Sequence, residues 1–236
     1  MRVIVCENYD EMSKTAAEFV RAKVTLKPDC ILGLATGSTP IGTYENIIKM
    51  NLDMSQVKTF NLDEYYPIKK SNDQSYDYFM NDNLFSKVNI KKENIDIPNG
   101  EAADPEAECK RYEEKIAKTG KIDIQILGIG PNGHIGFNEP DSYLQAHTHL
   151  TGLTDSTIEA NKRFFEKKED VPTKALTMGV STIMGAKTII LLASGAGKKD
   201  AVAKLLSNKV TPEVPASVLC MHDDTVIICD KEAYPF

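Results

Sequence analysis

Short apolar runs alternate along the chain with segments whose apolar residues recur at helical spacing. The runs are rich in Ile, Val and Leu and are bounded by polar or turn-forming residues, which favours buried strands. The expected strands are Arg2–Cys6, Cys30–Ala35, Val57–Leu62, Ile122–Ile129, Ala175–Met178, Thr188–Ala193 and Thr225–Cys229.

Helical patterns fill the intervals between these runs. After the first run, one helical face carries Met12, Ala16, Phe19, Val20 and Val24. A second helix is expected from Pro105 to about Thr119, burying Ala107, Tyr112 and Ile116. Continuous apolar strands separated by helices predict the α/β class, with a mainly parallel, Rossmann-like sheet covered by helices on both faces.

No repeat, low-complexity tract or Gly/Ser/Pro-rich linker divides the chain, so residues 1–236 are expected to form one domain. The polar, weakly patterned segment 147–171 lies between two expected strands and is interpreted as a lid over an active site. An ordinary surface helix and loop fits its pattern equally well.

The most informative stretch runs from Gly128 to Pro140, directly after an expected strand. Its glycines and prolines exclude regular structure, so Asn132, His134 and Glu139 lie on a shaped loop. In an open α/β sheet, ligands bind beyond the carboxyl ends of the strands. Histidine transfers protons near neutral pH, so this loop is a candidate catalytic site.

Two further loops have the composition of anion sites. Thr36, Gly37, Ser38 and Thr39 follow a strand, and Thr39 is expected to cap a helix that begins at Pro40. Ser194 to Lys199 follow another strand, and Lys198 can supply a positive charge to a phosphate. From pattern alone, a tight turn with a capped helix is an equally good interpretation of the first loop, and a solvated helix start is the commoner role of residues such as Lys198 and Lys199.

Asp63 and Glu64 follow the expected strand Val57–Leu62, and usually only one of two adjacent carboxylates faces a crevice. A helix cap or a solvated acidic pair is the common alternative. An ordinary Asp has a pKa of about 3.9 and is therefore expected to be ionised at neutral pH. His134, Glu139 and Asp63 are also conceivable metal ligands, but they lack the HExxH spacing, so no metal is expected.

Composition narrows the choice of partners. A net charge of −6 argues against a nucleic-acid-binding surface, and no segment approaches the ~20 apolar residues of a membrane span. The N-terminus is too short for a signal peptide, and the five cysteines show no CxxC spacing. A cytoplasmic protein with reduced thiols is expected.

Four segments in order resemble the glucosamine-6-phosphate deaminase family, in particular its short bacterial form. They are Leu34–Pro40, Phe60–Tyr65, Gly128–Pro140 and Asn161–Phe165. The resemblance covers about Val3 to Asp230 and implies conversion of glucosamine 6-phosphate to fructose 6-phosphate and ammonia, with no cofactor. It also implies roles for individual residues: Asp63 as the base at C2, His134 with Glu139 and Asn132 in ring opening, and Thr36, Gly37, Ser38, Thr39, Arg163 and Lys198 around the substrate phosphate.

Two alternatives remain at this point. The first, 6-phosphogluconolactonase, has a related fold but lacks the Phe137–Pro140 ending of the loop. The second, a sugar-phosphate sensor, needs a DNA-reading module, and the chain shows neither a helix-turn-helix extension nor a basic arm. Regulated, hexameric relatives carry basic effector-binding residues where this chain has Gln145–Thr151 without Lys or Arg, so a monomer or weak homo-oligomer is expected.

Overall fold

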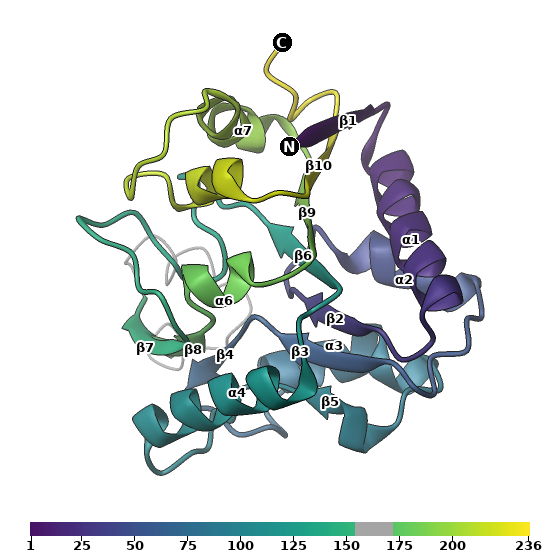
Figure 1. Cartoon of the computed structure of the whole chain (residues 1–236), viewed down its shortest axis with the longest axis vertical. Coiled ribbons are helices and arrows are strands. Elements are labelled where there is room, and N and C mark those ends of the chain that lie inside the picture. The colour runs from purple at the N-terminus through teal and green to yellow at the C-terminus, as the bar shows by residue number, and fades with distance from the viewer. Residues whose placement is uncertain (154–171) are drawn as a thin grey trace.

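The computed structural model describes residues 1–153 and 172–236, and the fold below refers to these residues. Within them, seven parallel strands form a central sheet in the order β1-β10-β9-β6-β2-β3-β5 (Figure 1). The strands are β1 (Arg2–Cys6), β2 (Ile31–Leu34), β3 (Lys58–Asn61), β5 (Ile95–Asp96), β6 (Ile124–Gly128), β9 (Thr188–Ala193) and β10 (Thr225–Asp230).

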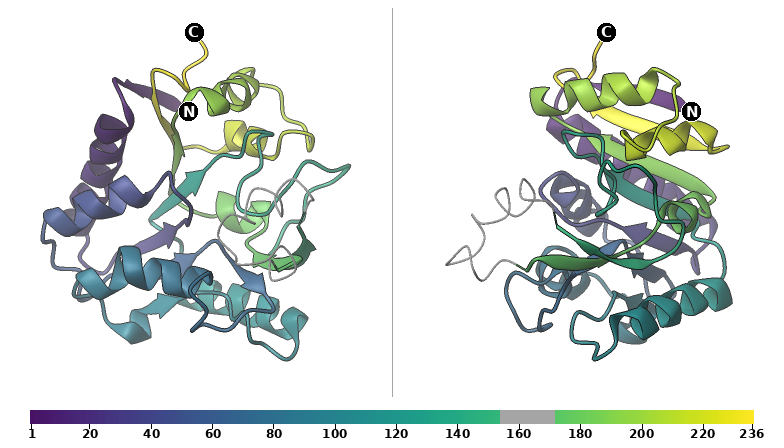
Figure 2. Two further views of the ribbon diagram at one scale, coloured as in Figure 1. Left: turned by 180° about the vertical axis from the view of Figure 1, so that it is seen from behind. Right: turned by 90° about the vertical axis from the view of Figure 1, so that its left-hand side faces the viewer.

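Helices cover both faces of this sheet, as the apolar pattern predicts (Figures 1 and 2). One face packs on α1 (Tyr9–Leu26), α2 (Ile41–Lys49) and α3 (Tyr76–Asn83), followed by η1 (Phe85–Lys87) and η2 (Lys92–Asn94). The other face packs on α4 (Pro105–Thr119), α6 (Val180–Met184), α7 (Lys199–Leu206) and η6 (Pro215–Met221). The short helix η5 (Ala196–Lys198) directly precedes α7. Central strands are almost entirely apolar because both of their faces are buried, as in β9, where only the first residue, Thr188, is polar.

The two helices expected from the sequence are α1 and α4, and both begin directly after a capping residue. In α1, the expected face is buried apart from the half-buried Phe19, and the Asn8 side chain accepts from the Glu11 N–H. α4 begins at Pro105 after an Asp104 cap. It buries Tyr112 and half-buries Ile116, but Ala107 is exposed, so that expectation was wrong.

A second, antiparallel sheet joins β4 (Asp63–Tyr66), β8 (Lys174–Thr177) and β7 (His149–Gly152) in the order β4-β8-β7. It lies at the α4 end of the molecule, away from β1 and both termini (Figures 1 and 2). The run Ala175–Met178 was expected in the parallel sheet; it forms β8 here, because its partners are the polar strands β4 and β7, which an apolar pattern does not reveal. The start of the expected lid is β7, and the rest of it lies outside the described residues.

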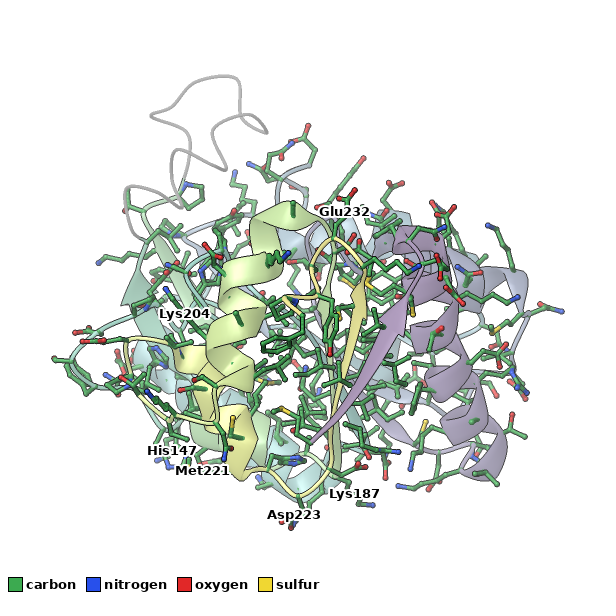
Figure 3. All side chains as sticks on the ribbon, turned by 90° about the horizontal axis from the view of Figure 1, so that it is seen from above. His147, Lys187, Lys204, Met221, Asp223 and Glu232 are labelled. Carbon is green, nitrogen blue, oxygen red and sulfur yellow. The ribbon has the colours of Figure 1, made fainter. Side chains whose placement is uncertain are left out.

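Side chains fill the space between the sheet and its helices, whereas Lys187, Lys204 and Glu232 lie at the surface (Figure 3). All five cysteines are free, and four of them are buried. In the described part of the chain no helix is long and apolar enough to cross a membrane.

Candidate active site

The carboxyl edge of the parallel sheet has a crossover point between β2 and β6. The two strands are neighbours, but the chain continues from β2 to β3 on one side and from β6 to β9 on the other. Such a point opens a crevice between the two loops that leave the strands, which is where open α/β sheets bind ligands. The loops are residues 35–40 and residues 129–140, the two that sequence analysis selected.

On the second loop, His134, Asn132 and Glu139 form one hydrogen-bonded group. Asn132 Oδ1 accepts from the His134 backbone N–H at 3.2 Å, and Asn132 Nδ2 donates to Glu139 Oε2 at 2.7 Å. His134 Nδ1 lies 2.7 Å from Asn132 Oδ1 and 3.3 Å from Glu139 Oε2. Both neighbours are acceptors, so Nδ1 carries the proton and Nε2 keeps the lone pair. The group can therefore transfer a proton through Nε2.

Gly130 makes room for this histidine. A Cβ atom on Gly130 would lie 2.2 Å from His134 Cε1, far inside van der Waals contact. The Gly130 N–H also donates to the His134 carbonyl at 2.9 Å, which closes the loop on itself. The imidazole consequently packs flat against the backbone at a position that only glycine allows.

Asp63 is not on a loop, as its sequence position suggested, but is the first residue of β4. It pairs with Thr177 of β8, and its carboxylate lies beside the turn of the second loop at Gly136. A Cβ on Gly136 would lie 3.5 Å from Asp63 Oδ2 and 2.9 Å from Thr177 Oγ1. The fold thus brings Asp63 to the same loop that carries His134.

Asp63 is 6% exposed, and burial, with a smaller contribution from the neighbouring Glu64, raises the pKa of its carboxyl to about 8. The expectation that Asp63 is ionised in the free protein at neutral pH was therefore wrong, because burial penalises the charged form. An ionised Asp63 is correspondingly a stronger base than an ordinary carboxylate.

The neighbouring Glu64 binds backbone groups at the start of helix α3. Burial raises its pKa to about 7, but three backbone N–H groups oppose this shift. They belong to Tyr65, Tyr76 and Asp77 and lie 2.8–2.9 Å from the Glu64 oxygens. Tyr76 and Asp77 open α3, so Glu64 holds the N-terminus of that helix against β4. Of the two adjacent carboxylates, only Asp63 is left for the crevice.

Two tyrosines that sequence analysis missed hold the first anion-site loop. The buried Tyr44 hydroxyl donates to the Ala35 carbonyl at 2.5 Å. The Tyr9 hydroxyl donates to the Ser38 carbonyl at 3.1 Å and accepts from the Gly42 N–H at 2.8 Å. Nothing in the local pattern marks these residues, because their contacts depend on helices α1 and α2 packing on the loop.

The capping expected for this loop was wrong in detail. α2 begins at Ile41, Pro40 occupies the cap position, and Thr39 makes no capping hydrogen bond. Thr36 and Thr39 are half-buried, Ser38 is exposed, and Gly37 has a φ of 93°, a left-handed conformation that favours glycine. The Thr36 side chain hydrogen bonds with Tyr76, so Ser38 and Thr39 carry the hydroxyl groups of the loop that no described residue binds.

Aromatic side chains connect this loop with the loop of residues 129–140. Tyr76 stacks on Phe137 with an interplanar angle of 3°, and both rings pack against Tyr65. The Tyr76 hydroxyl hydrogen bonds with Thr36 and Tyr65, and burial raises its pKa well above the usual range. Tyr76 therefore spans the distance between Thr36 and the loop that follows β6.

The second anion-site loop follows β9. Lys198 is half-buried, and burial lowers the pKa of its ammonium group. No carboxylate of the described residues lies within ion-pair distance of it, so its charge is available to an anionic ligand. Arg163, the other cation expected at the phosphate, lies outside the described residues.

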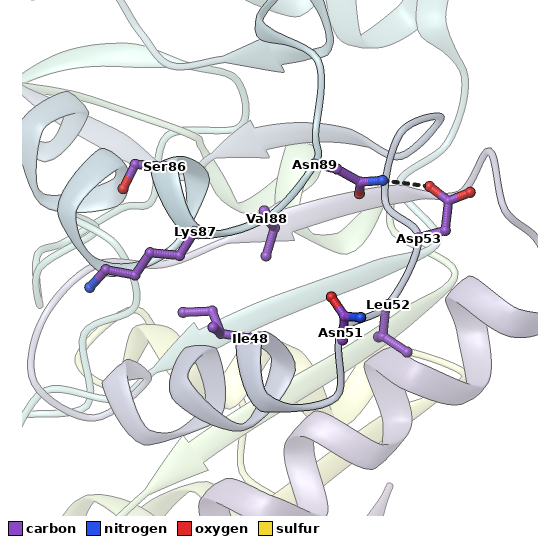
Figure 4. Close-up of a pocket in the computed structure, with 8 residues that line it drawn as sticks. All are labelled: Ile48, Asn51, Leu52, Asp53, Ser86, Lys87, Val88 and Asn89. Atoms are coloured by element: carbon purple, nitrogen blue, oxygen red, sulfur yellow. Dashed lines mark hydrogen bonds between the residues drawn. The ribbon is translucent and has the colours of Figure 1, made fainter.

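Other candidate sites are less persuasive. Residues 1–153 and 172–236 contain no group of three His, Cys, Asp or Glu side chains arranged to hold a metal. A polar groove of about 540 Å³ lies at the C-terminal end of α2, away from the carboxyl edge (Figure 4). Its Asn89 already donates to Asp53 at 2.8 Å. We assign it no part in the chemistry.

Comparison with known proteins identifies the family of the chain. The sequence profile of the family described as glucosamine-6-phosphate isomerases/6-phosphogluconolactonase matches residues 7–228. Glucosamine-6-phosphate deaminases of Clostridium botulinum (strain Kyoto / Type A2) and Clostridioides difficile (strain 630) are 58% and 56% identical to the chain. Each alignment covers 99% of this chain and, respectively, 97% and 95% of the relative.

Solved structures give the same result. A monomeric glucosamine-6-phosphate deaminase matches with a TM-score of 0.96 and 45% identity, covering 99% of this chain and 98% of that one. The 6-phosphogluconolactonase of Thermotoga maritima matches with a TM-score of 0.80 and 21% identity, covering 98% and 99%, and shows a shared fold alone. The chain therefore belongs to the glucosamine-6-phosphate isomerase/6-phosphogluconolactonase family.

Proposed function

We propose that this protein is a glucosamine-6-phosphate deaminase, which converts glucosamine 6-phosphate and water to fructose 6-phosphate and ammonia. The observation that carries the proposal is the meeting of two proton-transfer groups at one carboxyl edge. Asp63 lies beside the turn of the same loop that holds His134 against Asn132 and Glu139. Relatives over 50% identical along nearly their whole length are named as deaminases.

The first chemical step opens the sugar ring. His134 Nε2 takes the proton of the anomeric hydroxyl and returns it to the ring oxygen, so that the C1–O5 bond breaks and an aldehyde forms. Asn132 and Glu139 support this step because they hold Nδ1 protonated and stabilise the transient imidazolium.

The second step moves a proton from C2 to C1. Ionised Asp63 removes the C2 proton, an enolamine forms between C1 and C2, and the proton is delivered to C1. Water then adds to the resulting C2 imine, and ammonia leaves as the ketone forms. The substrate brings an ammonium group at C2, and an opposite charge close to a carboxyl lowers the pKa of that carboxyl. Substrate binding therefore favours the ionised base that the free protein holds back.

The phosphate is bound between the two anion-site loops. Thr36, Gly37, Ser38 and Thr39 offer hydroxyl and backbone N–H groups, and Lys198 offers a charge that no described carboxylate neutralises. Arg163 and a lid formed by residues 147–171 complete the proposed site. We also propose that the enzyme is a cytoplasmic monomer, since a solved relative of 45% identity is described as monomeric.

The test is turnover by the purified protein in the presence of EDTA. Ammonia and fructose 6-phosphate should appear in equal amounts from glucosamine 6-phosphate, whereas glucosamine should be a very poor substrate. Hydrolysis of 6-phosphogluconolactone is the counter-assay. Lactone hydrolysis without deamination would replace the proposal with the other activity of the family, and loss of activity in EDTA restored by a divalent ion would exclude the metal-free mechanism.

A further inference from the structure

Asp230, the last residue of β10, is a buried carboxylate that the mechanism above does not use. It is 5% exposed. One oxygen accepts from the Ser194 hydroxyl at 2.5 Å, and the Gly195 N–H lies 3.1 and 3.0 Å from the two oxygens. The Ala233 N–H adds a bond of 2.8 Å. Three donors, rather than a described cation, satisfy this charge.

Ser194 and Gly195 begin the loop that carries Lys198. Gly195 has a φ of 85°, and its carbonyl accepts from the Lys198 backbone N–H at 3.0 Å. Asp230 therefore holds Gly195 on its amide side while Lys198 is bonded on its carbonyl side. Asp230 itself is not an ion-pair partner of Lys198. Burial alone lowers the pKa of the Lys198 ammonium group.

We infer that Asp230 is a positioning residue for substrate phosphate: it fixes the loop from Ser194 to Lys198 so that the Lys198 ammonium faces the anion site. The inference rests on the proposed function, because it uses Lys198 as a phosphate ligand. A negatively charged group close to a phosphate opposes binding unless donors compensate its charge. Here the compensating donors belong to the loop itself, so the same bonds that screen Asp230 also order Lys198.

The chain offers a matched control at the other end of the same strand. Asp224, just before β10, accepts from the Thr188 hydroxyl at 2.7 Å, as Asp230 accepts from Ser194. Thr188 opens β9, and Ser194 directly follows its end. Both aspartates thus accept from a hydroxyl group of β9 or of the residue that follows it, but Asp224 also pairs with Arg2 at 2.7 Å, and only Asp230 is bonded to the loop that carries Lys198.

The experiment compares Asp230→Asn with Asp224→Asn, Lys198→Ala and the double variant Asp230→Asn/Lys198→Ala. It measures kcat and KM for glucosamine 6-phosphate, Kd for inorganic phosphate by calorimetry, and Tm. Asp230→Asn should raise KM and the phosphate Kd about tenfold, with kcat within about twofold, because a charge-assisted bond to the loop is lost. Asp224→Asn should lower Tm, because it weakens the contacts with Thr188 and Arg2, without changing KM or Kd. Ser194→Ala, a milder variant, should raise KM in the same direction.

The double variant decides whether Asp230 acts through Lys198. If it does, the double variant should bind phosphate no more weakly than Lys198→Ala alone, since coupled residues are not additive. Unchanged KM and Kd in Asp230→Asn, equal effects in Asp224→Asn, or fully multiplicative effects in the double variant would overturn the inference. Unchanged phosphate binding in Lys198→Ala would instead remove the proposed phosphate site, which separates that failure from this one.

Discussion

Asp63→Asn should inactivate the enzyme and at the same time stabilise its fold. The change removes the proposed base, which typically costs ~10²–10⁴ in kcat. The Asp63 side chain forms no hydrogen bond with another described residue, so the substitution breaks none there. What it does remove is a carboxyl whose ionisation the fold resists.

The size of the stabilisation follows from the shift in pKa. Folding raises the pKa of Asp63 from an ordinary 3.8 to about 8. The contribution of Asp63 to stability is therefore most favourable below pH ~4, falls as the pH rises from the unfolded to the folded pKa, and is constant above the folded pKa, because the unfolded chain loses this proton first. One pKa unit corresponds to 1.36 kcal/mol, so at pH 7 the loss amounts to at most about 4 kcal/mol. The Asn side chain, neutral at every pH, avoids this loss.

Denaturant unfolding of both proteins between pH 4 and pH 9 measures this difference. The free energy of unfolding of Asp63→Asn minus that of wild type should be near zero at pH 4, rise with pH, and level off above pH 8. Asp224→Asn is the control of opposite sign, because hydrogen bonding to Thr188 lowers the pKa of Asp224, and its loss should destabilise the protein above pH 4. A difference for Asp63→Asn that does not change with pH would refute the reasoning.

Three further predictions concern the same site. The kcat/KM of wild type, corrected for the titration of the substrate, should rise with pH through an apparent pKa near 8. At pH 7 it should reach about a tenth of its plateau value. A profile that stays flat from pH 6.5 to 8.5 would contradict this. Gly130→Ala should lower kcat by about 10²-fold because its methyl group displaces the His134 ring, whereas Gly128→Ala, which meets no atom within 4 Å, should be nearly silent in the same assay. Asn132→Asp would place a second carboxylate where Nδ2 now lies 2.7 Å from Glu139, raising the pKa of one of the pair, so kcat measured from pH 5 to 9 should show an additional ionisation. Superimposable kcat profiles for that variant and wild type would count against the assigned contact.

The sequence predicted those parts of the fold that local pattern determines. Each strand of the parallel sheet that is longer than two residues matches an apolar run within about two residues, because strands covered on both faces have apolar side chains in both directions. β4 escaped detection, since Asp63 and Glu64 are the residues least expected in a buried strand. Their burial depends on pairing with β8, more than a hundred residues later in the chain.

The same division holds for the candidate site. The loop after β6 could be predicted because His134, Asn132 and Glu139 lie within a few residues of one another and bond locally. Tyr9 and Asp230 could not, because each acts on a loop that belongs to a distant part of the chain. Local spacing carries information about local bonds, whereas a residue that orders a loop from another element becomes visible only when the elements are packed.

The adjacency of Asp63 and Glu64 explains why one of them is suited to be a base. Strand alternation directs neighbouring side chains to opposite faces, so the two carboxylates enter different environments. Glu64 accepts from three backbone N–H groups, two at the start of α3 and one of Tyr65 in β4, and these stabilise its charge. Asp63 receives no such donor from the described residues and is buried beside that charge, so its affinity for a proton rises. A carboxylate that binds its own proton tightly is also better at removing one from carbon, provided that the substrate supplies the ammonium group that first drives it into the ionised form.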